Sequence, residues 1–355
     1  MKVRTFLSLM AAALTAVLTL AIGAGTGFAR ADVQQAPAAT FKVTLVTDIG
    51  GLDDRSFNFL ANKGLQDAKK KLGVQGNVFI SKSDRDYIPN LTRAARDGSG
   101  LVIGVGFLMA DALAKVAKRF PKTKFAIIDN SGVPAELKNG NPTNVRGLLF
   151  KEQEAGYLVG YLAGLRAKNV PNSSGVIAAV GGLKIPPVDR FIAGYYVGAK
   201  KAFAGVTVEH SYSQDFVDQA KCKEAALNHI ANGASVVFQV AGQCGLGVLS
   251  AAKEKKVFGI GVDADQGYLG AHVLTSATKK VDVVVYKTIA AAQSGGAKFK
   301  TGFNAIFTVK NGGVGYGKIS SRAQPSWKKA VESIRVQIAS GKIKVTAQSP
   351  PATTG

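Results

Sequence analysis

The chain has 355 residues, with 45 Lys and Arg against 23 Asp and Glu, and 46% of its residues are hydrophobic. This length accommodates two ordinary domains, and the apolar content excludes a disordered chain. Two cysteines and three histidines cannot build a tetrahedral zinc site at the usual spacing, and the 41 glycines lack the three-residue period of collagen.

The N-terminal segment is typical of a secretory signal peptide. Lys2 and Arg4 precede an uncharged stretch, Thr5–Ala29, which ends in small residues before Asp32. The alternative is an uncleaved membrane anchor, since about 20 apolar residues can span a bilayer. We expect cleavage after residue 31, a flexible leader over 32–40 and a mature protein in the periplasm. No cysteine lies near the cleavage point, so we expect no lipid anchor.

From Phe41 onward, short apolar runs alternate with longer helical patterns. The expected strands are 41–46, 77–80, 101–103, 124–128, 145–149, 175–180, 206–210, 235–240 and 257–262. The expected helices are 56–72, 88–96, 110–120, 152–167, 190–203, 218–232 and 247–255. Continuous apolar strands that alternate with helices indicate parallel sheets covered on both faces. The number of strands suits two sheets, so we expect two α/β lobes, with the turn-rich segment 138–144 near the crossing between them.

The pattern changes toward the C-terminus. Segments 303–309 and 314–319 flank Lys310-Asn311-Gly312-Gly313, which predicts a β-hairpin. A last helix is expected over 325–340, and a polar tail over 345–355.

Three carboxylates stand at the expected carboxyl ends of strands, where folds of this class bind ligands. Asp48 follows the first strand, Asp129 follows the run KFAII, and Asp263 follows VFGIGV. An ionised carboxylate accepts two adjacent hydroxyl groups, which suits the ribose of a nucleoside or another sugar. The same residue type could supply general acid–base chemistry, hold a cation, or serve only as a helix cap or turn former.

Two aromatic residues lie beside the same edge. Phe57 stands at the start of the helix after Asp48, and Phe216 lies between a strand and its helix. Either ring could stack on a flat base, or it could close the entry of its helix as a hydrophobic staple.

Enzyme and nucleotide motifs are sparse. No glycine-rich turn has the spacing of a phosphate-binding loop, and no GxSxG motif occurs. His210, His229 and His272 lie within strand or helix patterns rather than at strand ends, so a hydrolytic triad is not expected.

The run DIGGLDDRSFN (48–58) resembles the opening motif of the basic membrane protein family. These are substrate-binding proteins of ABC transporters, and characterised members bind purine nucleosides. The resemblance continues in the family's order over nearly the whole mature chain. Its further stretches are FAIIDN (125–130), EQEAGYLVGYLAG (152–164), RFIAGYYVGAK (190–200), AKCKEAA (220–226), GIGVDADQ (259–266) and TSATKKVDVVVY (275–286).

The resemblance implies an α/β fold of the type I periplasmic-binding-protein class. Two doubly wound parallel-sheet lobes would close by a hinge around an interlobe cleft. The first lobe would comprise 41–147 and about 275–296, and the second 148–274 and about 297–344.

The resemblance also implies ligand contacts, residue by residue. Asp48 and Asn58 would contact the nucleoside, Phe57 and Phe216 would stack on the two faces of its base, Asp129 would bind from the first lobe, Gly242 would contribute backbone, Asp263 would take ribose hydroxyls, and Lys279 would add a polar contact. No catalytic residue, metal or cofactor is implied, and the expected partner is an ABC permease in the inner membrane.

Two departures from the family pattern stand out. Many members carry a lipid-modified cysteine at the mature N-terminus, which is missing here. Gln243 stands in a glycine turn where the family usually has a small residue, so it could change which base or ligand is accepted.

The two cysteines fall at one edge of the expected second sheet. Cys222 lies in the first turns of a helix and Cys244 just past the next strand, so a disulfide between them is plausible in an oxidising compartment. The alternative is two free buried thiols.

The excess of basic residues is spread thinly over helix faces and is not interleaved with aromatic residues, so nucleic-acid binding is not expected. The sequence therefore predicts a periplasmic receptor without enzymatic activity that captures a nucleoside, purines being favoured, for uptake by an ABC transporter. The alternatives are the same fold with a sugar or another small polar metabolite, an extracellular enzyme acting on nucleosides, and a sensor subunit.

Overall fold

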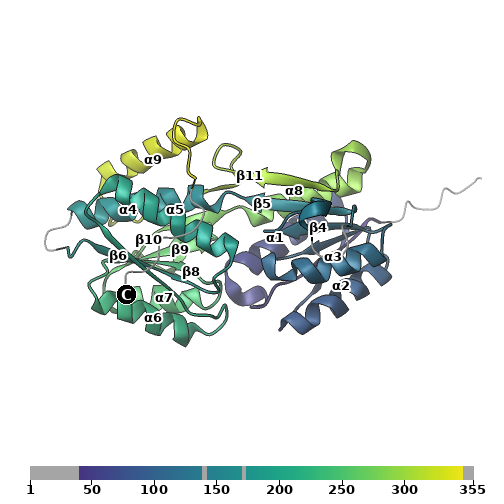
Figure 1. Cartoon of the computed structure of the whole chain (residues 1–355), viewed down its shortest axis with the longest axis horizontal. Coiled ribbons are helices and arrows are strands. Elements are labelled where there is room, and N and C mark those ends of the chain that lie inside the picture. Colours follow the sequence, from purple (N-terminus) through teal and green to yellow (C-terminus); the bar gives the residue numbers. More distant parts are fainter. Residues whose placement is uncertain (1–39, 138–141, 170–172, 347–355) are drawn as a thin grey trace, which may run out of the picture. The chain divides into compact units, whose positions relative to one another are not determined.

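The computed structural model describes residues 40–137, 142–169 and 173–346 (Figure 1). The expected signal peptide, nearly all of the leader, part of the turn 138–144 and most of the tail lie outside the described residues. Within them, the strands form two six-stranded sheets. No helix of this part of the chain is long and apolar enough to cross a membrane.

The first sheet is parallel throughout and has the order β11-β5-β4-β3-β1-β2. Its strands are β1 (Lys42–Val46), β2 (Gln75–Phe79), β3 (Leu101–Gly104), β4 (Lys124–Ile128), β5 (Val145–Phe150) and β11 (Phe303–Phe307). Its helices are α1 (Phe57–Leu72), α2 (Tyr87–Arg96), α3 (Ala110–Arg119) and α8 (Val281–Ser294), which packs against α1.

The second sheet has the order β12-β10-β9-β8-β6-β7, and only β12 runs antiparallel to its neighbour among the described pairs. Its strands are β6 (Val176–Gly181), β7 (Thr207–Tyr212), β8 (Val236–Val240), β9 (Phe258–Asp263), β10 (Val273–Lys279) and β12 (Val314–Tyr316). Its helices are α4 (Glu152–Asn169), α5 (Pro186–Ala202), α6 (Gln219–Ala231), α7 (Gly245–Glu254) and α9 (Pro325–Ala339).

The predicted α/β class and the alternation of strands and helices are confirmed. Each of the nine expected strands and each expected helix is present, with ends that differ by a few residues at most. The strands at the centre of both sheets are buried on both faces, as β3, β8 and β9 show. This explains why they read as continuous apolar runs.

The predicted hairpin is wrong. Strand β11 pairs with β5 in the first sheet, whereas β12 pairs with β10 in the second. The turn at Asn311 is present, and its side-chain oxygen accepts the Thr308 amide at 2.8 Å. It redirects the chain from one sheet to the other instead of pairing its own flanks. Consequently, the range 297–344, assigned to the second lobe in the sequence analysis, contains a strand of the first sheet.

Helices α4 and α5 approach each other unusually closely. A Cβ atom added at Gly156 or Gly160 of α4 would collide with the backbone carbonyl of Phe191 or Tyr195 on α5. The relation is reciprocal, since Gly194 and Gly198 of α5 meet carbonyl groups of α4. Backbone rather than side chain therefore forms this contact.

We expect Gly160→Ala to lower the free energy of unfolding by about 1–3 kcal/mol, because an overpacked core must shift its backbone. Urea denaturation followed by circular dichroism measures the effect. Gly315→Ala is the matched control, since a Cβ there meets only ordinary contact at 3.6 Å. Equal stability of the two variants would contradict the prediction.

Candidate ligand-binding site

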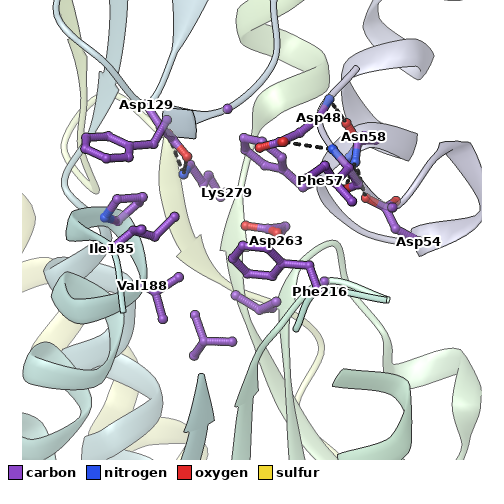
Figure 2. A pocket seen from close by; sticks show the side chains of 18 of the residues that line it. Asp48, Asp54, Phe57, Asn58, Asp129, Ile185, Val188, Phe216, Asp263 and Lys279 are labelled. Atoms are coloured by element: carbon purple, nitrogen blue, oxygen red, sulfur yellow. Dashed lines mark hydrogen bonds and ion pairs between the residues drawn. The ribbon is translucent and has the colours of Figure 1, made fainter. Parts of the chain in front are cut away.

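One pocket is lined by residues from elements of both sheets (Figure 2). The structure places all eight predicted contact residues in its lining: Asp48, Phe57, Asn58, Asp129, Phe216, Gly242, Asp263 and Lys279. The other lining residues are mostly apolar or glycine: Ile49, Gly50, Asp54, Gly106, Phe107, Ile185, Pro187, Val188, Phe191, Val240, Gln243 and Val262. Apolar walls with a few converging polar groups are typical of small-molecule sites.

The three predicted aspartates reach the pocket from strand ends. Asp48 lies two residues after β1, Asp129 directly follows β4, and Asp263 is the last residue of β9. Asp129 and Asp263 have φ of 69° and 59°, in the left-handed region that non-glycine residues seldom occupy. Such conformations cluster at binding sites, and Asp is among the side chains that tolerate them best.

Asp48 is oriented by its surroundings. The Tyr87 hydroxyl and the Ile49 amide both donate to its Oδ1 atom, the latter at 2.8 Å. Its other oxygen faces Gly106, where any Cβ would overlap it, so a glycine is needed there. Burial raises the pKa of Asp48 to about 6, although these hydrogen bonds partly offset the rise.

The start of α1 is organised by Asp54, which the sequence analysis did not single out. Its carboxylate accepts the backbone amides of Ser56, Asn58 and Phe59 at 3.0, 2.7 and 3.0 Å. The Asn58 side chain donates to Asp54 at 3.2 Å and accepts the Asp48 amide at 2.9 Å. Asn58 thus lines the pocket while its amide group holds the loop, and its contact with a ligand stays a prediction.

Lys279 is the buried cation of the site, and its side chain is only 2% exposed. Its Nζ atom lies 2.6 Å from Asp129 and 3.0 Å from Glu152, and Arg190 Nε lies 2.7 Å from Glu152. Burial lowers the pKa of Lys279, but the charges of Asp129 and Glu152 outweigh it and leave the pKa above its usual value. The Phe57 ring centroid lies 5.1 Å from the ammonium nitrogen, within cation–π range.

Asp263 has the highest pKa of the three predicted aspartates. The Ser56 hydroxyl lies 2.8 Å from Asp263 Oδ2 and 3.2 Å from the carbonyl oxygen of Val262. Burial raises the pKa of Asp263 to about 7, because Lys279 and Ser56 compensate for only part of the desolvation. New hydrogen-bond donors would therefore strongly stabilise the ionised form of this desolvated carboxylate.

The two predicted aromatic residues reach the pocket from different sheets. Phe57 is the first residue of α1, and Phe216 lies in the loop between β7 and α6. The Phe216 ring packs over Gly182, where a Cβ atom would overlap it. Gly242 reaches the pocket in a left-handed conformation, with φ of 55°.

The sequence analysis missed the residues that hold the lining in place. These are Asp54, Ser56, Tyr87, Glu152 and Arg190. Two of them carried a usable signal, since Glu152 is the first residue of α4 and Asp54 lies three residues before α1, positions where an acidic side chain stabilises a helix. Tyr87 and Arg190 meet their partners only through the tertiary fold. Among the described residues, no cluster of His, Cys, Asp and Glu could hold a metal ion.

We expect the free energy of unfolding of the ligand-free protein to fall as pH rises from about 4 to about 7. The pKa values of Asp48 and Asp129 are raised to about 6 and that of Asp263 to about 7, in each case chiefly by burial. In this window the folded state binds more protons than the unfolded state, so raising the pH favours unfolding.

Urea titrations at pH 4.5, 6 and 8 measure the effect, and Asp263→Asn should flatten the upper part of the profile. The prediction would be wrong if the free energy of unfolding rose over this pH range, or if Asp263→Asn left the profile unchanged. Either result would show that folding does not disfavour the ionised form of these carboxylates.

Comparison with known proteins agrees with the architecture and with the motifs. The family model described as "ABC transporter substrate-binding protein PnrA-like" matches residues 41–349. A relative from Lactococcus lactis, named ABC transporter nucleoside-binding protein BmpA, is 36% identical and covers 86% of this chain and 89% of its own. An uncharacterized lipoprotein of Pyrococcus abyssi is 33% identical and covers 89% of this chain and 77% of its own.

A solved structure has the same architecture. The crystal structure of an ABC transporter solute-binding protein from Aeropyrum pernix superposes with a TM-score of 0.77 at 29% identity, covering 86% of this chain and 93% of its own. The resemblance stated from the motifs is therefore confirmed. The chain belongs to the basic membrane protein family of ABC transporter substrate-binding proteins.

Proposed function

We propose that this chain captures a nucleoside, with purines favoured, and delivers it to an ABC permease. The observation that carries the proposal is a single pocket that combines two aromatic rings, Phe57 and Phe216, with carboxylates at strand ends. The nucleoside-binding relative from Lactococcus lactis supports the same ligand class.

The chemistry of the lining divides between the parts of a nucleoside. The rings and apolar side chains such as Val188 and Phe191 suit a flat base, for which stacking on an aromatic ring contributes about 1–3 kcal/mol. Asp263 suits the ribose, because its carboxylate can accept two neighbouring hydroxyl groups. These hydroxyls would compensate the desolvation that raises the pKa of Asp263 to about 7.

Capture is proposed to occur between two lobes, each built on one sheet. The chain passes from the first sheet to the second after β5, returns for α8 and β11, and ends in the second sheet with β12 and α9. Three crossings allow the lobes to rotate as bodies. The first lobe then comprises 41–150, about 280–296 and β11, and the second comprises the remainder up to about 344. The expected limits at 147 and 275 shift because β5 of the first sheet runs to Phe150 and β10 of the second sheet runs to Lys279.

Binding without chemistry is proposed, even though the chain contains a serine–histidine–glutamate row. Ser211 Oγ lies 2.9 Å from His229 Nε2, and His229 Nδ1 lies 2.7 Å from Glu209. These residues belong to β7 and α6 and do not line the pocket. These hydrogen bonds therefore connect the edge strand β7 to helix α6, outside the pocket in which a nucleoside is proposed to bind.

A periplasmic location is proposed from the signal-peptide pattern of residues 1–31, and the lack of a lipid anchor is proposed from the cysteine count. The chain contains two cysteines, and both form the Cys222–Cys244 disulfide. No thiol is then left for lipid attachment. The lipoprotein name of the Pyrococcus relative makes fractionation of the expressed protein worthwhile.

Calorimetric titration of refolded, ligand-free protein tests the proposal. The ligands are adenosine, guanosine, inosine, uridine and ribose. We expect saturable binding of a purine nucleoside, no measurable binding of ribose, and no release of free base during the experiment. Binding of ribose alone would support a sugar receptor, and release of base would support an enzyme. The absence of binding to every nucleoside would overturn the nucleoside assignment.

We expect Asp263→Asn to weaken nucleoside binding by about 10-fold to 100-fold, since a hydrogen bond to a charged group contributes about 1.5–3 kcal/mol. The thermal midpoint of the ligand-free variant should not fall, because the substitution removes a costly buried charge. Titration calorimetry and thermal unfolding measure the two effects. Asp111→Asn, at an exposed position on α3, is the control. Wild-type affinity of the Asp263 variant would remove this residue from the site.

A further inference from the structure

Two neighbouring loops of the second sheet form one wall of the pocket. The loop after β7 contributes Phe216, and the loop after β8 contributes Gly242 and Gln243. In a parallel sheet such loops are joined only through their strands and helices. Here they are also joined directly.

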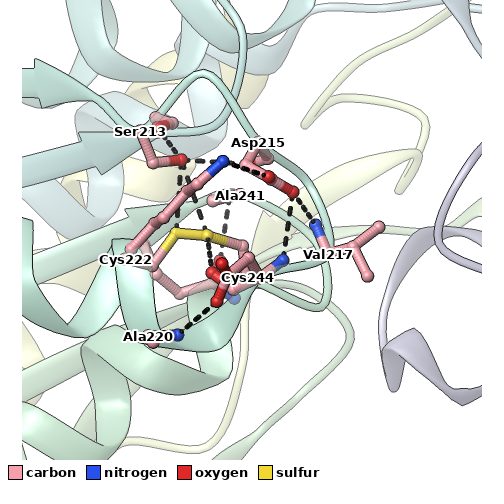
Figure 3. The surroundings of a disulfide bond; sticks show 11 residues. Ser213, Asp215, Val217, Ala220, Cys222, Ala241 and Cys244 are labelled. Carbon is pink, nitrogen blue, oxygen red and sulfur yellow. Dashed lines mark hydrogen bonds and ion pairs between the residues drawn. A yellow bond between two sulfur atoms is a disulfide. The ribbon is translucent and has the colours of Figure 1, made fainter.

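The direct links are covalent and polar (Figure 3). The Cys222–Cys244 disulfide connects the start of α6 to the end of the second loop, with a Cα–Cα distance of 5.5 Å. Both cysteines are fully buried. The amide of Cys244 also donates to the Phe216 carbonyl at 3.0 Å. Phe216 and Gln243 are therefore held in one rigid unit.

The Phe216 loop is further fixed by its own hydrogen bonds. Asp215 accepts the amides of Val217 and Asp218 at 2.8 and 3.0 Å, and Lys221 lies 2.9 Å from its carboxylate. Together with the packing of the ring on Gly182, these contacts leave the side chain of Phe216 little freedom. Preorganisation of this kind reduces the entropy cost of binding.

Among the residues that the structure describes, Gln243 alone lines both of two neighbouring hollows. It lines the pocket and also an adjoining groove whose walls include Leu52, Phe59, Leu246 and Lys253. Its side-chain amide makes no hydrogen bond within the described part of the chain, although the residue is partly buried. An amide offers both a donor and an acceptor, and a ligand that covers it without supplying partners for both leaves a desolvated polar group, which costs free energy. A ligand that supplies the partner is favoured over one that does not.

We propose that Gln243 is a specificity-determining residue for the ligand, and that the Cys222–Cys244 bridge positions it together with Phe216. The inference rests on the proposed nucleoside function and deepens it. The ligands selected are nucleosides whose base places a donor and an acceptor where both meet the Gln243 amide, and bases that place them elsewhere bind more weakly.

The selectivity is tested with Gln243→Ala and titration by adenosine, guanosine, inosine and uridine. The ratio of Kd values between the two tightest ligands should change by twofold to tenfold, which is the range of one neutral hydrogen bond. Gln219→Ala is the matched control, since Gln219 lines the groove but not the pocket. A change of less than twofold in the Gln243 variant, or an equal change in the control, would overturn the assignment.

The positioning role is tested with the double variant Cys222→Ala and Cys244→Ala. We expect the Kd of the tightest nucleoside to rise at least fivefold. Val248→Ala is the control, because Val248 is buried in the same small core cluster as the two cysteines, so its truncation lowers stability while the bridge stays intact. A Kd within fivefold of wild type, or an equal loss in the control, would overturn the positioning role.

Titration of the wild-type protein in a reductant, which opens the bridge without a substitution, tests the same role where the double variant does not fold. The same fivefold criterion applies to it. A wild-type protein that binds no nucleoside would overturn the proposed function and this inference with it. A wild type that binds, with unaltered selectivity in the Gln243 variant, would overturn this inference alone.

Discussion

The buried ammonium group of Lys279 is the interaction on which the rest of the site depends. It comes from β10 of the second sheet and lies 2.6 Å from Asp129, which follows β4 of the first sheet. Glu152 shares it at 3.0 Å and is itself paired with Arg190. Removing one member of such a cluster typically costs about 3–5 kcal/mol, because the remaining charges stay buried without a counterion. The cluster therefore fixes the place where the two sheets meet at the pocket.

This charge balance explains why the pKa values of the other carboxylates in the pocket stay raised. Lys279 is already shared by two acidic residues, so Asp263 receives too little positive charge to offset its burial. The pKa of Asp263 is therefore raised to about 7, and burial likewise raises the pKa of Asp48 to about 6. A neutral ligand rich in hydrogen-bond donors can supply the hydrogen bonds that would compensate the desolvation of these two carboxylates. An anionic ligand would meet additional repulsion at both positions.

Much of the fold was predictable because parallel strands and their helices alternate in hydrophobic pattern; β4 was predicted with its observed ends. Strand β10 was missed because VLTSATK is rich in polar residues, yet all seven residues are buried. The side chains of Thr275, Ser276 and Lys279 find partners within the fold. The hairpin prediction failed because a turn sequence cannot reveal which sheet its flanks will join. Likewise, Asp263 was predictable from its place at a strand end. The partners of Tyr87 and Arg190, which are Asp48 and Glu152, lie far from them in the sequence, so no local pattern could indicate these contacts.

The two faces of the pocket are constructed by different means. On the first-sheet side, Asp48, Phe57 and Asn58 belong to a loop and helix start held by hydrogen bonds around Asp54. On the second-sheet side, a disulfide joins the loops that carry Phe216 and Gln243. Hydrogen bonds can be remade in a shifted geometry, whereas a disulfide with its flanking strands permits little displacement. Adjustment to different ligands should therefore occur on the Asp54 side, and discrimination between them on the side of the disulfide.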